Sequence, residues 1–408
     1  MSHYVRIPIC SGKATTAFPS ARTQRGRPCG RLEEPLFRKR HLAGIAAIAA
    51  VAITLTGCAG SDPGTTAGGT DASTATSAEA FGGIDALVTA AQAEGQLNVI
   101  ALPETWANYG QIISAFEDKY GITVNSADPD VSSAEEITAA TNLKGQDTAP
   151  DVFDLGTAVA LSSLDFFAPY QVANWDEIPA DNKETTGLWV NDYTGSMSIG
   201  YNSNVVEAPT SLDDLLGESF RGKVAINGDP TQAGAAFAAI GLAAAQEGGG
   251  SLDDFQPGID FFQKLNQAGN FLPVDPTPAT IASGETPVVF DWSYNNLSVA
   301  STVDGWKVTT LPGVAYTSYY NQAVNVDAPH PAAARLWQEF IFSPEAQNLY
   351  LAAGAYPVTL PALVDAGTVD QSALDSVGEL PSELVTPTEA QSTAGAALLA
   401  EKWAAAIG

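Results

Sequence analysis

Histidine and cysteine are scarce in this chain. Its 408 residues include three of each, and the only one of these six that lies beyond Cys58 is His330. A zinc site of His and Cys, a Ser-His-Asp triad and a Cys-His pair each need residues that this part of the chain lacks. The sequence therefore excludes most metal-assisted and nucleophilic catalysis. It leaves carboxylate, hydroxyl and aromatic groups as the candidates for function.

Basic residues are the second shortage. The chain has 18 Lys and Arg against 46 Asp and Glu, and residues 1–57 hold nine of the 18 but only Glu33 and Glu34 of the acids. From Cys58 onward, nine basic residues thus stand against 44 acidic ones, a net charge of −35. Nucleic-acid phosphates need basic neighbours, so this charge argues against a nucleic-acid partner. The hydrophobic content of 45% is enough for a large core without disulfides.

A long apolar run is missing as well. The run from about Leu42 to Thr56 is shorter than the roughly 20 residues that a membrane-spanning helix needs. The basic stretch Arg38-Lys39-Arg40 precedes it and Leu55-Thr56-Gly57-Cys58 ends it, a pattern typical of a secretory signal. This ending resembles the lipobox of bacterial lipoproteins, which implies cleavage before Cys58 and lipid attachment to that residue. We expect residues 1–57 to be a signal peptide with a long basic extension, and the mature protein to be exported and anchored on the outer face of the cytoplasmic membrane.

Beyond the anchor, a tether precedes a folded part in which helices and strands alternate. Residues 58–80 are rich in Gly, Ala, Ser and Thr and lack aromatic residues, so we expect them to be disordered. The apolar spacing then predicts helices over 84–93 and 112–120 and strands over 97–102, 123–124 and 152–153. Strands separated by helices favour a parallel α/β sheet with helices on its faces.

A second block with the same character begins near residue 196. It contains an alternating segment at 196–202, strands at 223–226 and 287–290, and an alanine-rich stretch from Ala233 to Gln246. Helical signals return after His330-Pro331, where Trp337 falls on an apolar stripe that predicts a core position. We assign His330 to a turn and helix start, and not to a metal site.

Three segments resemble the extracellular solute-binding proteins of ABC importers, above all the polyamine and ferric-iron binders. These segments are EGQLNVIALPETWANYGQIISAFEDKYGI, PTSLDDLLGESFRGKVAINGDP and APHPAAARLWQEFIFSPEAQNLYLAAGAYPV. The resemblance implies an α/β fold of the type II periplasmic-binding-protein kind, with two lobes joined by two crossing strands and a ligand cleft between them. It places the crossings at about 196–201 and 321–326. The lobes that it implies are residues 84–198, then 199–321, with 322–408 returning to the first lobe and adding C-terminal helices.

Acidic and aromatic residues gather just after the predicted strands, where open α/β sheets bind ligands. The candidate ligand-binding residues of this kind, together with a tyrosine before the second crossing, are Glu104, Trp106, Tyr109, Asp154, Asp229, Asp291, Trp292, Tyr294 and Tyr320. Each has a structural alternative: Asp154 and Asp229 could cap helices, and the two tryptophans could belong to the core.

The resemblance implies a function in which the protein captures a small solute and delivers it to a permease and its ATPase, as a monomer without cofactor or catalysis. Carboxylates and aromatic rings favour a cationic amine such as a polyamine. Ferric iron or another organic solute is the alternative, although iron binders use adjacent tyrosines where this chain has Tyr294 alone. A departure from the polyamine binders is Tyr320 or Asn321 at the position of their second-crossing aspartate. A surface-anchored hydrolase with paired carboxylates and a sensor or adhesion module are rivals from other classes.

Overall fold

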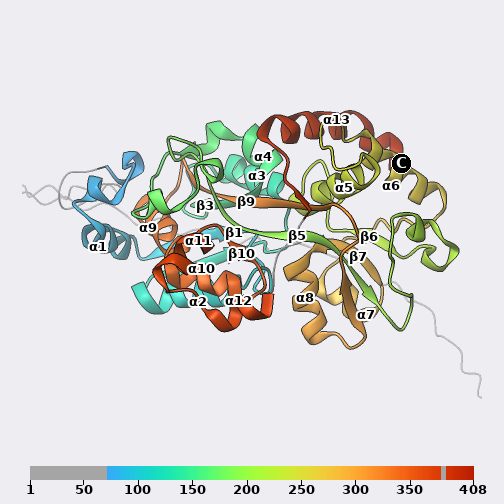
Figure 1. Ribbon diagram of the computed structural model, residues 1–408. Coiled ribbons are helices and arrows are strands. Elements are labelled where there is room, and N and C mark those ends of the chain that lie inside the picture. Colours follow the sequence, from blue (N-terminus) through green and yellow to red (C-terminus); the bar gives the residue numbers. More distant parts are fainter. Residues whose placement is uncertain (1–70, 378–382) are drawn as a thin grey trace, which may run out of the picture. The chain divides into compact units, whose positions relative to one another are not determined.

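The computed structural model describes residues 71–377 and 383–408 (Figure 1). The predicted signal peptide, Cys58 and most of the tether lie outside the described residues. Within the described part, no helix is long and apolar enough to cross a membrane. The α-helices are α1 (Ile84–Glu94), α2 (Tyr109–Tyr120), α3 (Ser133–Leu143), α4 (Thr157–Ser162), α5 (Gly234–Glu247), α6 (Gln256–Gln267), α7 (Pro278–Ser283), α8 (Ser293–Thr302), α9 (Pro331–Ile341), α10 (Pro344–Ala352), α11 (Leu360–Ala366), α12 (Gln371–Val377) and α13 (Glu389–Ile407). The strands are β1 (Gln96–Ile100), β2 (Thr123–Ala127), β3 (Val152–Gly156), β4 (Phe167–Ala168), β5 (Val190–Asn202), β6 (Val224–Ile226), β7 (Val288–Trp292), β8 (Trp306–Thr309), β9 (Ala315–Asn325), β10 (Tyr356–Pro357) and β11 (Leu384–Val385).

Two long strands, β5 and β9, run through both blocks of the chain and lie side by side (Figure 1). The first half of β5 pairs with β9 and β10, and from Met197 onward β5 pairs with β7 and β8 instead. In the same way β9 pairs with β11 at its start and with β3 from Tyr320 onward. Strand β5 is thus shared between the strands of the first block and the strands β7 and β8 of the second, whereas the partners of β9 are β3, β4, β5 and β11.

The strand pairs differ in direction between the short strands and the two long strands. The pairs β1–β2 and β6–β7 are parallel, as expected for strands connected through a helix. The pairs that involve β5 are antiparallel, as are β3–β9 and β4–β9. The prediction of a parallel sheet therefore holds for the strand–helix–strand units and for the pair of β9 with the short strand β11, whereas the other pairs of the two long strands are antiparallel.

The alanine-rich helix α5 lies at the centre of the second block and is buried from Ala235 to Ala245. Small side chains let it approach its neighbours closely. A Cβ on Gly241 would lie 2.3 Å from the ring of Tyr316 in β9, and a Cβ on Gly156 would lie 2.7 Å from Cα of Gly234. The end of β3 and the start of α5 are therefore in direct contact, which brings the first and second blocks together.

Residues 71–80 differ from the tether predicted for them. They form short 3-10 helices at Ala72–Thr74 and, with Phe81, at Ala78–Phe81, and these pack against α9 and α1. The buried guanidinium of Arg335 donates to the carbonyl oxygens of Ser73 (2.8 Å) and Ala75 (2.6 Å). Composition could not reveal this order, because the stabilising partner lies some 260 residues away on α9.

The C-terminal helix α13 packs against both blocks. Its Trp403 contacts the ring of Phe262 on α6, with ring centroids 5.9 Å apart, and Gly395 lies against Phe255. The same helix also packs against α4 of the first block (Figure 1). The sequence-based assignment of residues 322–408 to the first lobe does not anticipate the contacts of α13 with the second block.

Candidate ligand-binding site

A cavity of about 330 Å³ lies where the carboxyl ends of strands from both blocks meet. The first block contributes the loops after β1 and β2 together with Asp154 of β3. The second block contributes the segment 227–235, the start of α7 and Asp291 of β7, and Tyr320 of β9 lies between them. This is the position that the rule for open α/β sheets predicts for a ligand.

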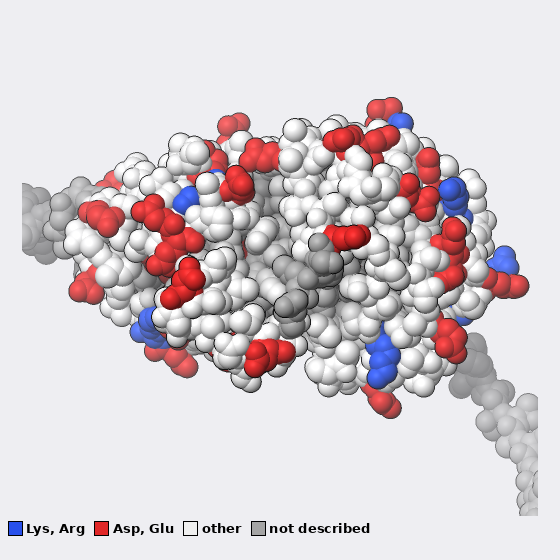
Figure 2. Space-filling view, in the orientation of Figure 1, with Lys and Arg blue, Asp and Glu red and all other residues white. Residues whose placement is uncertain are grey.

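The charged side chains that line the cavity are all acidic. Among the described residues, its side chains include no Lys, Arg or His, whereas the acids are Asp130, Glu135, Glu136, Asp154, Asp229, Asp275 and Asp291. Acidic residues also outnumber basic ones on the face of the molecule shown in Figure 2. A concave site with charge of one sign concentrates the electrostatic field and attracts the opposite charge.

Among the lining acids that the sequence analysis selected, Asp154 is the least exposed to solvent. It is 6% exposed, and its Oδ2 accepts hydrogen bonds from the hydroxyls of Tyr109 (2.7 Å) and Tyr193 (3.2 Å). Its Oδ1 is buried and has no hydrogen-bond partner among the described residues. Burial raises the pKa of Asp154 to about 7, although the tyrosine hydroxyls act in the opposite direction.

Asp192 of β5 lies behind Asp154 and was not singled out by the sequence. It is fully buried, and its Oδ1 accepts from the backbone N–H of Tyr193 (2.7 Å). Its Oδ2 accepts from Nε2 of Gln322 (3.0 Å) and from the hydroxyls of Tyr109 (3.4 Å) and Tyr350 (3.5 Å). Burial, followed by the charge of Asp154, raises the pKa of Asp192 well above its usual value.

Glu136 is a second buried acid that the sequence analysis missed. It is 1% exposed, and its Oε2 accepts from the backbone N–H of Asp154 (3.2 Å). A signal for it does exist: Ser132 and Glu135 form a capping box at the start of α3, which leaves Glu136 to turn inward. Burial, and then the charge of Asp154, raise the pKa of Glu136 well above its usual value.

Asp291 is the buried acid of the second block. It is 8% exposed, and its Oδ1 accepts from the backbone N–H of Trp292 (2.7 Å) and from Asn295 (3.1 Å). Its Oδ2 accepts from Nδ2 of Asn227 (3.0 Å). Burial raises the pKa of Asp291 to about 6, against these hydrogen bonds.

Aromatic rings form one wall of the site. Trp106 lines the cavity and donates from Nε1 to the hydroxyl of Tyr193 (2.7 Å), while its ring meets that of Tyr320 edge-on with centroids 5.6 Å apart. Trp292 donates to the hydroxyl of Tyr320 (3.3 Å), and its ring stacks on that of Tyr294. The loop that carries Trp106 has left-handed backbone at Ala101, Ala107 and Asn108, with φ of 58°, 44° and 70°. Left-handed backbone in residues other than glycine is strained, and such strain is often found at functional sites.

The structure brings most, but not all, of the predicted site residues together. Those that line the cavity are Trp106, Asp154, Asp229, Asp291 and Tyr320. Those that are buried behind its wall and contact a lining residue are Tyr109, Trp292 and Tyr294. Glu104 is exposed and lines a more open hollow that adjoins the cavity, since the two share lining residues such as Asp130 and Thr277.

The structural alternative of helix capping does not apply to the two aspartates. The N-cap residues of α4 and α5 are Gly156 and Ala233. Asp229 instead holds a turn, where its Oδ1 accepts from the backbone N–H of Thr231 (2.8 Å). His330, in contrast, is the N-cap residue of α9, as its assignment to a helix start predicted, and Trp337 is fully buried in the core.

Metal binding has no obvious site in the described part of the chain. No group of three or more His, Cys, Asp or Glu residues there is arranged to hold a metal ion. The buried acids of the cavity lie instead among tyrosine hydroxyls and amide groups.

Solved structures of several binding proteins share this fold. A putative spermidine/putrescine ABC transporter from Listeria monocytogenes is 13% identical with a TM-score of 0.57, over 75% of this chain and 98% of that one. The ferric binding protein from Campylobacter jejuni is 15% identical with a TM-score of 0.54, over 76% and 99%. The fructose-6-phosphate-bound AfuA from Actinobacillus pleuropneumoniae is 17% identical with a TM-score of 0.56, over 77% and 98%. These likenesses confirm the predicted fold, two α/β lobes of the type II periplasmic-binding-protein kind.

The family follows from the sequence. No curated protein has a significantly similar sequence. A family model described as bacterial extracellular solute-binding protein matches residues 151–378, which is more than half of the chain. The matched range includes Asp154, Asp291, Tyr320 and both long strands. The resemblance drawn from the sequence is therefore confirmed, and the chain belongs to the family of bacterial extracellular solute-binding proteins.

Proposed function

We propose that this protein is the solute-binding component of an ABC importer, and that its ligand is a cationic amine such as a polyamine. The observation that carries the ligand class is the charge of the cavity, whose described lining has seven acidic side chains and no basic one. An anionic or phosphorylated ligand would meet repulsion from every side. A ligand with ammonium groups would meet only attraction.

The two kinds of side chain in the lining suit the two parts of a polyamine. The carboxylates of Asp154, Asp229 and Asp291 can accept charge-assisted hydrogen bonds from ammonium groups. The rings of Trp106 and Tyr320 offer flat apolar surface to the methylene chain and cation–π attraction to the ammonium groups. Hydrogen bonds already hold Asp291 and Trp106 in place without a ligand, so little ordering is needed on binding.

The mechanism follows from a site lined by both blocks. We place the change of lobe within β5 between Ser196 and Met197, where its pairing partners change, two residues before the boundary expected from the lobes 84–198 and 199–321; residues 322–408 still return to the first lobe. A ligand that contacts Asp154 on one side and Asp291 on the other stabilises the closed form only. The permease, with its ATPase, then recognises the closed form. Export, lipidation at Cys58 and a monomeric state complete the proposal.

Calorimetry with putrescine, spermidine, ferric citrate and a panel of amino acids tests the ligand class. We expect heat of binding with at least one of the two amines. For that amine, Asp291→Asn should weaken binding by about 1.5–3 kcal/mol, roughly ten- to a hundredfold. The matched control is Asp118→Asn, which removes the same charge from the exposed side of α2. If neither amine gives heat of binding, and if iron binds with a tyrosinate-to-iron absorbance band, the ligand would be ferric iron and not an amine.

A further inference from the structure

Two carboxyl groups, those of Asp154 and Asp192, are buried together at the inner end of the cavity. The hydroxyl of Tyr109 lies 2.7 Å from Oδ2 of Asp154 and 3.4 Å from Oδ2 of Asp192, so the two acids share this donor. Only Asp154 lines the cavity; Asp192 lies behind it and is fully buried. The pair therefore has one member that a ligand can touch and one that it cannot.

In the part of the chain that the structure describes, no cationic group forms an ion pair or a hydrogen bond with either carboxyl group. The polar groups that face it are tyrosines, an amide and one further acid: Tyr109 from α2, Tyr193 from β5, Tyr350 from α10, Gln322 from β9 and Glu136 from α3. Farther along the same site, Tyr294 of α8, Tyr320 of β9 and Asp291 of β7 add no positive charge. Two buried negative charges without a counter-ion are costly, and such a pair normally retains a proton.

Two unpartnered oxygen atoms show where a ligand and a proton fit. Oδ1 of Asp154 is buried and has no hydrogen-bond partner within residues 71–377 and 383–408, although Asp154 lines the cavity. Oε1 of Gln322 likewise has no partner among the described residues, while Nε2 of the same amide donates to Asp192 and to the hydroxyl of Tyr109 (3.0 Å each). Rotation of this amide by half a turn would present an acceptor to a protonated Asp192 instead of a donor to an ionised one. Gln322 can thus serve both protonation states.

We propose that the Asp154–Asp192 pair is a proton-exchange site, at which an ammonium group of the ligand displaces a proton. This inference rests on the proposed function, because it needs a cationic ligand. Without ligand, the closed protein holds one proton on the pair. When an ammonium N–H donates to Oδ1 of Asp154, the carboxyl O–H bond breaks and its proton passes to solvent. One positive charge enters as one leaves, so the buried charge of the pair and its ligand is unchanged.

Proton exchange makes ligand affinity depend on pH in a defined direction. Burial raises the pKa of Asp154 to about 7 and raises that of Asp192 well above its usual value, so the free pair is protonated in mildly acidic solution. Binding must then release the proton, and affinity rises with pH, at most about tenfold per unit for one proton. Above the pKa of the free pair the affinity levels off. A primary amine stays charged throughout, since its pKa lies near that of lysine, about 10.4.

Calorimetry of spermidine binding at about pH 7 in two buffers of different ionisation enthalpy measures the protons released. We expect the apparent enthalpy to differ between phosphate and imidazole by an amount that corresponds to release of a substantial part of one proton. Asp192→Asn removes one of the two carboxyl groups and should abolish most of that difference. Asp118→Asn, on the surface, should leave it unchanged.

The outcomes separate the two proposals. No heat with any amine in either buffer would overturn the amine ligand itself. Amine binding with equal enthalpy in both buffers would overturn proton exchange and leave the ligand class intact. Proton release that persists in Asp192→Asn would assign the proton to another acid, such as Asp291 or Glu136, and would also overturn the proposal. If Asp192→Asn does not fold, the buffer comparison on the unaltered protein still decides whether protons are released. In addition, the affinity of the unaltered protein for spermidine must rise from about pH 5.5 and level off by about pH 8.5.

Discussion

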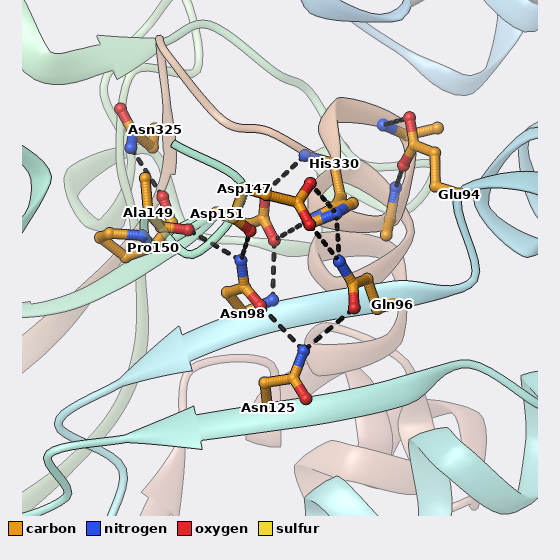
Figure 3. A network of polar contacts seen from close by, with 12 residues as sticks. Glu94, Gln96, Asn98, Asn125, Asp147, Ala149, Pro150, Asp151, Asn325 and His330 are labelled. Carbon is orange, nitrogen blue, oxygen red and sulfur yellow. Dashed lines mark hydrogen bonds and ion pairs between the residues drawn. The ribbon is translucent and has the colours of Figure 1, made fainter. Parts of the chain in front are cut away.

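Asp151 and Asp154 lie three positions apart in the sequence and both are buried, yet their surroundings are opposite. Asp151 precedes β3, and its carboxylate is fully surrounded: it accepts from the backbone N–H groups of Asn98 and His330 (2.7 Å each) and from Nδ1 of His330 (2.9 Å). Figure 3 shows this network, which joins β1, the start of α9 and the segment before β3. Asp154, within β3, has an oxygen atom, Oδ1, without a hydrogen-bond partner and has no cationic neighbour among the residues that the structure describes.

The comparison of Asp151 with Asp154 shows how a carboxylate that stabilises the fold can be distinguished from one that binds a ligand. The pKa of His330 reflects two opposed effects: burial alone would lower it, but the hydrogen bond and charge of Asp151 raise it. The imidazolium form and Asp151 therefore stabilise each other inside the protein. Nothing in the described structure does the same for Asp154. A buried carboxylate whose hydrogen-bond partners all lie within the protein stabilises the fold. A buried carboxylate at a cavity wall with an unpartnered oxygen atom is instead a candidate for ligand binding.

Removal of the structural carboxylate should have the largest effect. Asp151→Ala leaves His330 and two backbone N–H groups buried without an acceptor. Loss of one member of a buried pair typically lowers the free energy of unfolding by about 3–5 kcal/mol. Urea denaturation should show this loss, while the amine affinity of the folded fraction stays the same. An unchanged denaturation midpoint would remove the distinction between the two aspartates.

Asp154→Asn should produce the converse result. The amide oxygen can still accept from Tyr109 and Tyr193, so the ligand-free protein should be no less stable. Binding of an amine should weaken by about 1.5–3 kcal/mol, because a charged acceptor is lost. Denaturation and calorimetry on the same preparation measure both quantities. A destabilised variant with normal affinity would mean that Asp154, like Asp151, is structural.

Stability of the ligand-free protein should fall as pH rises. The folded-state pKa of Asp154 is raised from its usual value near 3.8 to about 7, so its stabilising contribution is complete at acidic pH and is lost between these values. The slope for one proton is at most about 1.4 kcal/mol per pH unit. The raised pKa of His330 acts in the same direction but begins only near its usual value of 6.5. Denaturation at a series of pH values should therefore show a decline below pH 6.5 that is reduced in Asp154→Asn; an equal decline in that variant would contradict the assignment.

The sequence predicted the cavity better than it predicted the buried pair. Acids and aromatics near strand ends gave Trp106, Asp154, Asp229 and Asp291, because the position of a ligand relative to a strand end is a local property, although Asp154 and Asp291 lie within β3 and β7 and not in the loops predicted after them. Asp192 lies within a strand, where alternation assigns a polar residue to solvent. It is buried only because Gln322 and Tyr350, more than 100 residues later, fold over it.

The extent of β5 was missed for a related reason. The resemblance placed a crossing at about 196–201, within the alternating segment, but the strand begins at Val190. A register shift between Asn191 and Thr194 interrupts the alternation in this part of the strand. The polar residues Asn191 and Asp192 are buried there by partners on other strands and helices. Single-sequence periodicity contains no information about such partners.

The smallest effect should come from the exposed edge of the structural network. Asp147 lies 3.5 Å from Nε2 of His330, but its side chain is 81% exposed, whereas that of Asp151 on the other side of the ring is fully buried. Exposed ion pairs contribute about 0–1 kcal/mol, because water screens the charges. Asp147→Asn should therefore change the free energy of unfolding far less than Asp151→Ala, and should lower the pKa of His330 only slightly, measurable by NMR titration of its ring. A loss as large as that of Asp151→Ala would mean that the number of contacts to His330, and not their burial, determines the stability of this network.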